Sequence, residues 1–156
     1  LKPVHALLYF LPGIPSVYYG SEFGIEGRKE QGGDDALRPA IDLEQMKKDN
    51  PHPELTRWIR TLGNIRKKYP DACGDGRYQE LLLTNRQYAF ARIGVEHTVL
   101  TAVNNDEGAS APVSFPVPVE GVYRDALTGE TVPAEGGRIS LELEPCGCRI
   151  LVCGRE

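Results

Sequence analysis

Apolar positions divide the first fifty residues into a helix, a strand and a long polar connection. Residues 2–11 carry apolar side chains at helical spacing, and Pro12-Gly13 ends that helix. Residues 14–19 are β-rich and apolar on both faces, which predicts a strand buried on both sides, as in a parallel sheet. Residues 21–50 then form a charged, glycine-rich connection, and connections of this length are commonly functional or disordered.

A second amphipathic helix follows this connection, after a short helical turn predicted over residues 43–48. The pattern predicts the helix over residues 53–68, with Pro53 in its first turn and basic residues at its C-terminal end. One of its faces carries Leu55, Trp58, Ile59, Leu62 and Ile65. Burying each of these large side chains contributes about 1.5–3 kcal/mol, so the helix is expected to pack on a partner surface, with Trp58 in the core.

The pattern changes to short strands after Pro70. We predict strands over residues 77–83, 87–93, 98–104, 111–117, 121–125, 138–143 and 149–153. Turn signals rich in Gly, Asn and Asp separate many of them, as at residues 84–86, 104–108, 128–129 and 135–137. Several short strands at this spacing indicate an antiparallel sandwich with its own core.

Composition and charge exclude several classes of partner. The 156 residues are 40% hydrophobic and 26% charged, with a formal net charge of -4 and interspersed signs. No basic stripe is present to replace the counterions of a nucleic-acid backbone. The longest apolar stretch, residues 6–11, is far too short to span a bilayer. We therefore expect neither a nucleic-acid nor a membrane partner.

The cysteines favour a reducing environment over a metal site. Cys146-Gly-Cys148 lacks a second Cys or His pair at metal spacing, which argues against zinc. Cys148 and Cys153 lie an odd number of residues apart in a strand pattern and should face opposite sides of it. We favour reduced thiols, Cys73 included, in a cytoplasmic protein over a disulfide. The chain begins at Leu1 inside an apolar pattern, which we interpret as truncation.

Several motifs resemble one enzyme family. Residues 13–22 read Gly-Ile-Pro-Ser-Val-Tyr-Tyr-Gly-Ser-Glu, which resembles the segment around the eighth barrel strand of the α-amylase superfamily, typically Gly-x-Pro-x-(Ile/Val)-Tyr-Tyr-Gly-x-Glu. Residues 58–70 resemble the eighth barrel helix of that family. Gly76-x-Tyr78 and residues 88–92 and 99–104 resemble its C-terminal sandwich domain. The resemblance covers nearly the whole chain.

This resemblance implies a mixed fold, a partial (β/α) barrel fragment followed by an all-β antiparallel sandwich. Residues 1–72 would be the C-terminal remnant of the catalytic (β/α)8 barrel, and residues 73–156 the sandwich domain. The implied parent is an α-amylase-type glycoside hydrolase that acts on α-glucans or maltodextrins. Whether it is a hydrolase or a transglycosylase stays open at this stage.

The same resemblance places the catalytic residues upstream of Leu1. Glycoside hydrolysis requires two carboxylates that flank the scissile bond, and the family carries these on earlier barrel strands. We therefore expect no catalytic residue in this chain and no hydrolysis by the chain alone. The sandwich would stabilise the barrel and shield its helices. The alternative is a carbohydrate-binding β-sandwich module.

Two residues are candidates for the substrate side of the parent enzyme, Glu22 and Arg38. Loops that follow barrel strands form the active face of such folds, so the connection after Gly20 would border the substrate groove. Glu22 could contact substrate, but we favour an ion pair with a loop arginine such as Arg28 or Arg38. The Arg38 guanidinium resembles one that the family often carries, and it could hold a sugar hydroxyl or a carboxylate.

The remaining candidates have plainer interpretations. No cofactor is expected, and Asp34-Asp35 is better explained as a solvated acidic turn than as half of a calcium site, although the parent could hold calcium elsewhere. We expect core packing for two tyrosines that could instead stack on sugar, Tyr18 and Tyr19. Four aromatic residues fit the inner face of the sandwich better than a sugar-stacking platform: Tyr78, Tyr88, Phe90 and Tyr123.

The predicted strand over residues 14–19 would lack its barrel neighbours in this chain. Unpaired strand edges and an apolar face favour association with another chain. We therefore expect the first fifty or so residues to be disordered or to pack against a second copy, while the helix around Trp58 stays docked on the sandwich.

Overall fold

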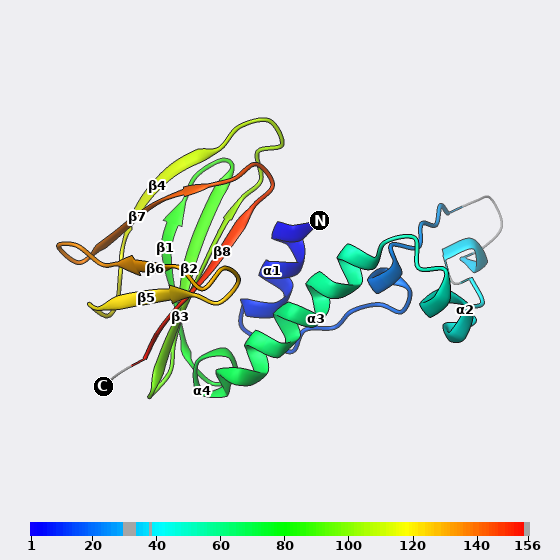
Figure 1. The fold of residues 1–156 in the computed structure, drawn as a ribbon, viewed down its shortest axis with the longest axis horizontal. Helices are drawn as coiled ribbons and strands as arrows, with labels where there is room; N and C mark the ends of the chain where they lie inside the picture. Colours follow the sequence, from blue (N-terminus) through cyan, green and yellow to red (C-terminus); the bar gives the residue numbers. More distant parts are fainter. Residues whose placement is uncertain (30–33, 38, 155–156) are drawn as a thin grey trace. The chain divides into compact units, whose positions relative to one another are not determined.

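The structure, a computed structural model, describes residues 1–29, 34–37 and 39–154. Its helical elements are α1 (Lys2–Phe10), the 3-10 turns η1 (Ser21–Phe23) and η2 (Asp35–Leu37), α2 (Leu43–Lys48), α3 (Pro53–Lys68) and α4 (Pro70–Cys73) (Figure 1). Its strands are β1 (Arg77–Leu83), β2 (Gln87–Ile93), β3 (His97–Asn104), β4 (Ala111–Pro116), β5 (Val122–Asp125), β6 (Thr131–Pro133), β7 (Arg138–Leu143) and β8 (Cys148–Gly154).

The strands form two antiparallel sheets. One has the order β1-β2-β3-β8-β5-β6, and the other consists of β4 and β7. Each predicted strand after Pro70 is confirmed within one residue at either end, whereas the three-residue β6 and the four-residue α4 were not predicted. Elements this short carry too few positions for periodicity to reveal them.

The core between the sheets comes from the side chains that the two sheets turn toward each other. The large members of this core are Leu100, Phe115, Tyr123, Ile139, Leu143 and Leu151. Cys153 belongs to the same core, and Cys148 lies an odd number of residues away on β8, so the two thiols face opposite sides as predicted.

A second core covers the other face of the larger sheet. Helix α1 contacts β3 and β8, and its Ala6 and Phe10 are fully buried. The sheet contributes Phe90, Val99 and Ile150 to this face, and all three are fully buried. The central strands are therefore buried on both faces.

The described residues divide into two compact units. One consists of residues 1–15 and 61–156, and the other of residues 16–60, so α3 contributes to both. The boundary after residue 72 refers to the barrel of a larger protein and stays a prediction. Helix α1 corrects the expectation of disorder for its part of the first fifty residues, because it is an ordered helix packed on β3 and β8. The alternative, packing of these residues against a second copy, stays a prediction.

The strand predicted over residues 14–19 is absent from the structure, and this prediction was wrong. Residues 14–18 have no regular structure, and Tyr19 and Gly20 form a turn. Every strand pairing among the described residues is antiparallel and lies within the two sheets, so this segment has no neighbour to complete its hydrogen bonds. The described residues accordingly contain no closed barrel.

The paired tyrosines were also wrongly predicted to lie in a core. Tyr18 and Tyr19 are 55% and 47% exposed, and their ring centroids lie 5.0 Å apart. The Tyr19 hydroxyl donates to the Pro39 carbonyl at 3.2 Å. On the apolar face of α3, Leu55, Ile59, Leu62 and Ile65 are buried, while Trp58 is half-buried.

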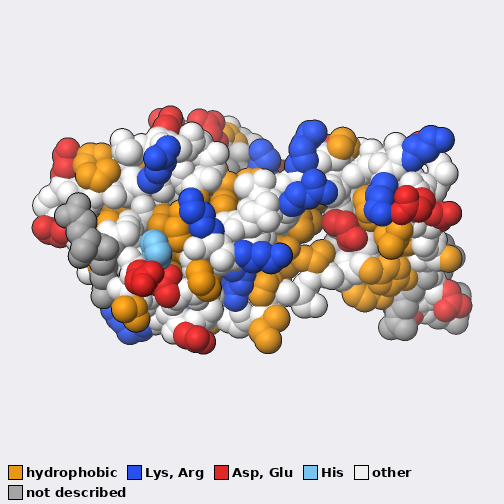
Figure 2. Space-filling view, turned by 60° about the horizontal axis from the view of Figure 1, so that its bottom comes forward, with side chains coloured by type: hydrophobic (Ala, Val, Ile, Leu, Met, Phe, Trp, Pro, Cys, Tyr) orange, Lys and Arg blue, Asp and Glu red, His pale blue; other side chains and the backbone are white. Residues whose placement is uncertain are grey.

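The surface agrees with the sequence in having no large area of one charge on the face in view. Figure 2 shows Lys and Arg side chains interspersed with acidic and hydrophobic ones. Among the residues that the structure describes, no helix has the length and apolar character needed to cross a membrane.

Candidate functional site

Glu22, one of the two predicted substrate-side residues, lies in the unit formed by residues 16–60. Glu22 lies half-buried in η1, and its carbonyl accepts a hydrogen bond of 2.6 Å from Thr56 Oγ1. Gly20 precedes it with φ 84°, a left-handed conformation that favours glycine, and a Cβ there would lie 2.9 Å from Ile25 Cδ1. The backbone of η1 is thus fixed on both sides of Glu22.

Arg38 lies outside the described residues, so its relation to Glu22 stays a prediction. Asp34 makes an exposed ion pair of 3.1 Å with Lys29, which fits a solvated turn. Among the described residues, no cluster of three or more His, Cys, Asp or Glu side chains has the geometry to hold a metal ion.

The other unit joins its helices to the sheet through Arg92, a residue that sequence reasoning did not select as a site. This arginine on β2 is 2% exposed, and its guanidinium donates to the carbonyls of Gly74 at 2.7 Å, Gly76 at 3.2 Å and Phe10 at 3.3 Å. Burial lowers its pKa, but a guanidinium stays protonated at neutral pH. One side chain therefore ties α1, α4 and β1 together.

A second arginine acts on the same end of α1. Arg66 of α3 donates to the carbonyl of Tyr9 and, at 2.8 Å, to that of Gly13. The last carbonyls of a helix lack partners within it, and cations near this end are stabilising. The basic C-terminal turn of α3 thereby satisfies the end of α1.

A carboxylate holds the turn between β2 and β3 on α4. Asp71 Oδ2 accepts from the backbone N–H groups of Glu96 and His97, both at 2.9 Å, and Oδ1 lies 3.0 Å from His97 Nδ1. Burial raises the pKa of Asp71, but hydrogen bonds from the His97 backbone, the His97 ring and Glu96 outweigh it and lower the pKa. Gly94 is required beside it, because a Cβ there would overlap Asp71 Oδ2.

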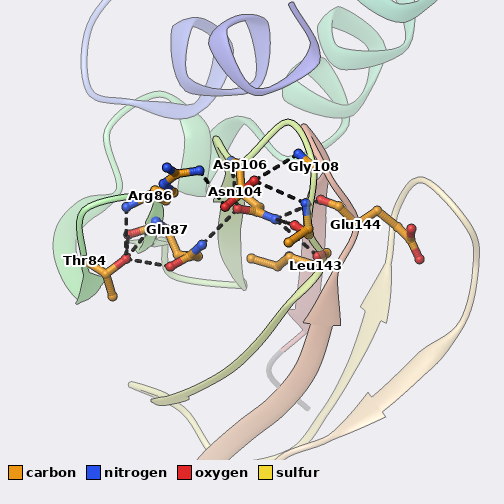
Figure 3. Close-up of polar contacts among 9 residues, drawn as sticks. Thr84, Arg86, Gln87, Asn104, Asp106, Gly108, Leu143 and Glu144 are labelled. Atoms are coloured by element: carbon orange, nitrogen blue, oxygen red, sulfur yellow. Dashed lines mark hydrogen bonds and ion pairs between the residues drawn. The ribbon is translucent and has the colours of Figure 1, made fainter.

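A buried amide organises the opposite end of the larger sheet (Figure 3). Asn104, the last residue of β3, is fully buried. Its Nδ2 donates to the carbonyls of Ala109 at 2.9 Å and Glu144 at 3.2 Å. Its Oδ1 accepts from Gln87 Nε2 at 2.9 Å and from the Asp106 N–H at 3.0 Å. A fully satisfied buried amide of this kind fixes three loops in one arrangement.

A groove of about 340 Å³ lies beside this network. Val4 and Leu7 of α1 form one wall, and residues 84–88 at the start of β2 form the other. Tyr88 is among the lining residues, and its hydroxyl bonds to that of Tyr78. Burial, followed by the Tyr78 hydroxyl, raises the pKa of Tyr88, so the Tyr88 hydroxyl is neutral.

Four aromatic residues were predicted to lie on the inner face of the sandwich, and the structure shows that this prediction was wrong for three of them. Phe90 and Tyr88 alternate with the core residues Ala89 and Ala91, so they lie on the helix-covered face. Tyr78 packs on Phe90 with 5.7 Å between ring centroids. Only Tyr123 lies in the core between the sheets, as predicted.

A buried carboxylate on β5 has a structural role. Asp125 is fully buried, and it accepts from Arg149 Nε and, at 2.8 Å, from the Leu127 N–H. Arg149 Nη2 also binds Glu130 at 2.8 Å. The four cysteines are free, and burial raises the pKa of Cys73 to about 11 and that of Cys148 to about 12, so these two are protonated thiols at neutral pH.

Comparison with known proteins assigns the sheet region. Residues 78–150 match the family described as "Maltogenic Amylase, C-terminal domain". Neopullulanase 2 from Thermoactinomyces vulgaris is 30% identical over 153 residues, which are 92% of this chain and 24% of that protein. Cyclomaltodextrin glucanotransferase from Klebsiella oxytoca is 28% identical over 131 residues, 84% of this chain and 20% of that protein.

Solved structures show the same fold over nearly the whole chain. An Anoxybacillus α-amylase matches with a TM-score of 0.81 and 25% identity, covering 99% of this chain and 32% of that one. The α-amylase of Geobacillus thermoleovorans matches with a TM-score of 0.83 and 23% identity, covering 99% and 33%.

These findings define the class first: the sheet region is a C-terminal β-domain of the α-amylase family. Within that class, residues 78–150 belong to the maltogenic amylase C-terminal domain family. The chain spans only about a fifth to a quarter of the length of the first curated relatives.

Proposed function

We propose that this chain is the C-terminal part of an α-amylase-type glycoside hydrolase acting on α-glucans or maltodextrins. Its own role is to stabilise the barrel of that enzyme without catalysing hydrolysis. The observation that carries the proposal is Arg92, which fastens two helices outside the matched domain onto a sheet that belongs to the maltogenic amylase C-terminal family. Helices and sheet form one cooperative support rather than two loosely joined parts.

The engagement of three carboxylates supports the proposed absence of catalysis by the chain. Hydrolysis requires a carboxyl pair about 5–9.5 Å apart that faces the sugar from both sides. Asp71 and Asp125 accept the structural hydrogen bonds described above, and Asp106 pairs with Arg86 at 2.7 Å. These groups cannot protonate a leaving oxygen without giving up the contacts that hold their loops.

Within the proposed enzyme, Glu22 and Arg38 remain our candidates for the substrate side. The support for Glu22 is the fixed backbone of η1. The Glu22 carbonyl accepts a hydrogen bond from Thr56, and Gly20 turns the chain two residues before Glu22. A side chain placed on a fixed backbone can contribute to specificity at little entropic cost.

A chimera tests the proposal directly. The matching segment of Neopullulanase 2 from Thermoactinomyces vulgaris is replaced by this chain, and reducing-sugar release from maltodextrin is measured. We expect the chimera to keep activity that the same enzyme without the segment loses, while this chain alone releases none. A chimera that melts cooperatively but is inactive would contradict the proposal, as would turnover by the purified chain above a mock-purified control.

Variants of the same chimera separate support from substrate contact. Arg92→Leu should lower the melting temperature and leave the KM of the remaining folded enzyme unchanged. Glu22→Gln and Arg38→Lys should instead reduce kcat/KM with an unchanged melting temperature. Unchanged kinetics in both would remove these two residues from the substrate side.

A further inference from the structure

We propose that Asn50 and Thr56 are positioning residues for Glu22 and act through the backbone of η1. The proposal rests on the proposed function, which places Glu22 on the substrate side of the parent enzyme. All three residues belong to the unit formed by residues 16–60. The hydrogen bonds that connect them fix the direction of the Glu22 side chain without engaging its carboxylate.

The contacts of Glu22 hold its backbone rather than its side chain. The carboxylate makes no hydrogen bond or ion pair with another described residue, although the side chain is half-buried. The backbone carbonyl of the same residue accepts from Thr56 Oγ1 at 2.6 Å. A carboxylate that is partly withdrawn from water ordinarily has a partner. Among the described residues, the Glu22 carboxylate therefore has no structural role and stays available to a ligand.

The Thr56 hydroxyl does not make the bond that is common for a threonine in a helix. Such a hydroxyl can donate to the carbonyl three or four residues earlier in the same helix. The carbonyl of His52 accepts the Thr56 N–H at 3.3 Å, but the hydroxyl donates to Glu22, 34 residues earlier in the chain. The first turns of α3 thus present a hydroxyl group to η1.

Asn50 determines where the proton of the Thr56 hydroxyl points. Asn50 Nδ2 donates to Thr56 Oγ1 at 2.8 Å, so the proton of that hydroxyl is left for the Glu22 carbonyl. Asn50 Oδ1 accepts the His52 N–H at 2.9 Å, which fixes the orientation of the amide. Hydrogen bonds in such a chain polarise and strengthen one another. Together they form a relay from the His52 N–H through Asn50 and Thr56 to Glu22.

The peptide planes on both sides of Glu22 are held. In the plane before it, the Ser21 carbonyl accepts from the Gly24 N–H at 3.1 Å. In the plane after it, the Glu22 carbonyl accepts from Thr56, and the Phe23 N–H donates within the turn at 3.1 Å. Because each peptide unit is planar, holding both planes fixes the two backbone dihedral angles of Glu22. The direction of its Cα–Cβ bond is therefore set before a ligand binds.

Loss of the relay would release the plane that follows Glu22. A misplacement of about 1 Å in a group that positions substrate can cost about a hundredfold in rate, even when the change lies far from the reacting atoms. Thr56 and Asn50 would therefore affect catalysis by the parent enzyme through Glu22, without touching the substrate themselves.

The test measures kcat/KM for maltodextrin in the chimera with Neopullulanase 2. Thr56→Val keeps the shape of the side chain and removes the hydroxyl, so we expect kcat/KM to fall by about fivefold or more. Thr56→Ser keeps the hydroxyl and should restore kcat/KM to within about twofold of the unsubstituted chimera. The matched control is Thr61→Val, at a half-buried threonine of α3 whose side chain has no partner among the described residues, and it should leave kcat/KM unchanged.

A double variant separates positioning from a general weakening of the fold. If Thr56 acts through Glu22, the effects of Thr56→Val and Glu22→Gln are not additive. Thr56→Val should then change kcat/KM by less than about twofold when Glu22 is already replaced. Asn50→Asp, which keeps the acceptor for His52 and loses the donor to Thr56, should show the same dependence on Glu22. Losses of equal size in both backgrounds would overturn the proposal, as would a failure of Thr56→Ser to restore kcat/KM.

Hydrogen exchange in the chain alone gives a readout that does not depend on activity. Thr56→Val should speed amide exchange at Phe23 and Gly24, and Thr61→Val should not. Unchanged exchange at these two amides would overturn the relay. An inactive unsubstituted chimera would overturn the proposed function and this inference with it. An active chimera in which Thr56→Val and Asn50→Asp have no effect would overturn this inference alone.

Discussion

Removal of the Asp71 carboxylate should detach the β2–β3 turn from α4. Asp71→Ala deletes the acceptor of two backbone N–H groups and of the His97 ring. A hydrogen bond to a charged group contributes about 1.5–3 kcal/mol, but the three share one acceptor and water can reach the turn, so they are not additive. We expect a loss of about 2–3 kcal/mol, which corresponds to a melting temperature lower by about 4–12 °C for a chain of this size.

The pH dependence of folding stability tests independently whether the charged Asp71 carboxylate stabilises the folded state. The pKa of Asp71 is lowered in the folded state. Its contribution is therefore fully present above the unfolded-state pKa of about 3.9, and it is lost as the pH falls through the lower folded-state pKa. Asp71→Asn keeps the size of the side chain and removes the charge. The stability difference between the native chain and Asp71→Asn should be constant from neutral pH to about 5 and shrink below about 4.

The assay is thermal unfolding followed by near-ultraviolet circular dichroism, with hydrogen exchange at Glu96 and His97 as the local measurement. Glu107→Gln, an exposed carboxylate in a loop, is the control and should change stability by less than about 0.5 kcal/mol. If Asp71→Ala unfolds at the same temperature as this control, and exchange at the turn is unchanged, the carboxylate does not hold the turn.

Three further predictions concern the helix layer. Arg92→Leu should destabilise the chain by about 3 kcal/mol and speed amide exchange in α1, because it leaves three carbonyls without their donor; Arg92→Lys should not restore stability, since an ammonium cannot span the same acceptors. Gly94→Ala should cost about 1–3 kcal/mol by calorimetry, because its methyl group would overlap Asp71 Oδ2, and an unchanged transition would show that the turn yields. Val4 and Leu8 on α1 are 59% and 37% exposed, so we expect this apolar surface to self-associate. Light scattering should show a mass that rises with protein concentration, and a smaller rise for Val4→Glu/Leu8→Glu. A constant monomer mass would exclude this surface from self-association.

Local pattern was sufficient for most of the secondary structure. A short apolar run that includes Ala89, Phe90 and Ala91 marks β2, which is buried on both faces. Leu55, Ile59 and Leu62 recur at helical spacing and mark α3. The family motifs around residues 13–22 and 99–104 also indicated the class of protein. Neither inference depends on residues that are distant in the sequence.

The sequence did not determine which face of a strand packs in the core between the two sheets and which face packs under the helices. Alternation groups Tyr88 with Phe90, but both faces of β2 are buried, so the pattern cannot say which of them meets β4 and β7 and which meets the helices. That choice depends on the layers that cover the sheet. For the same reason the groove beside Tyr88 could not be predicted.

The sequence by itself determined where the helices and strands occur after residue 52, except the short α4 and β6, together with the family to which the sheet belongs. Only the tertiary structure decided the state of residues 14–19 and the roles of Arg92, Asp71 and Asn104. A strand requires neighbours to complete its hydrogen bonds, and a buried polar side chain requires acceptors or donors from distant segments. Both requirements concern partners far along the chain, and local periodicity contains no information about them.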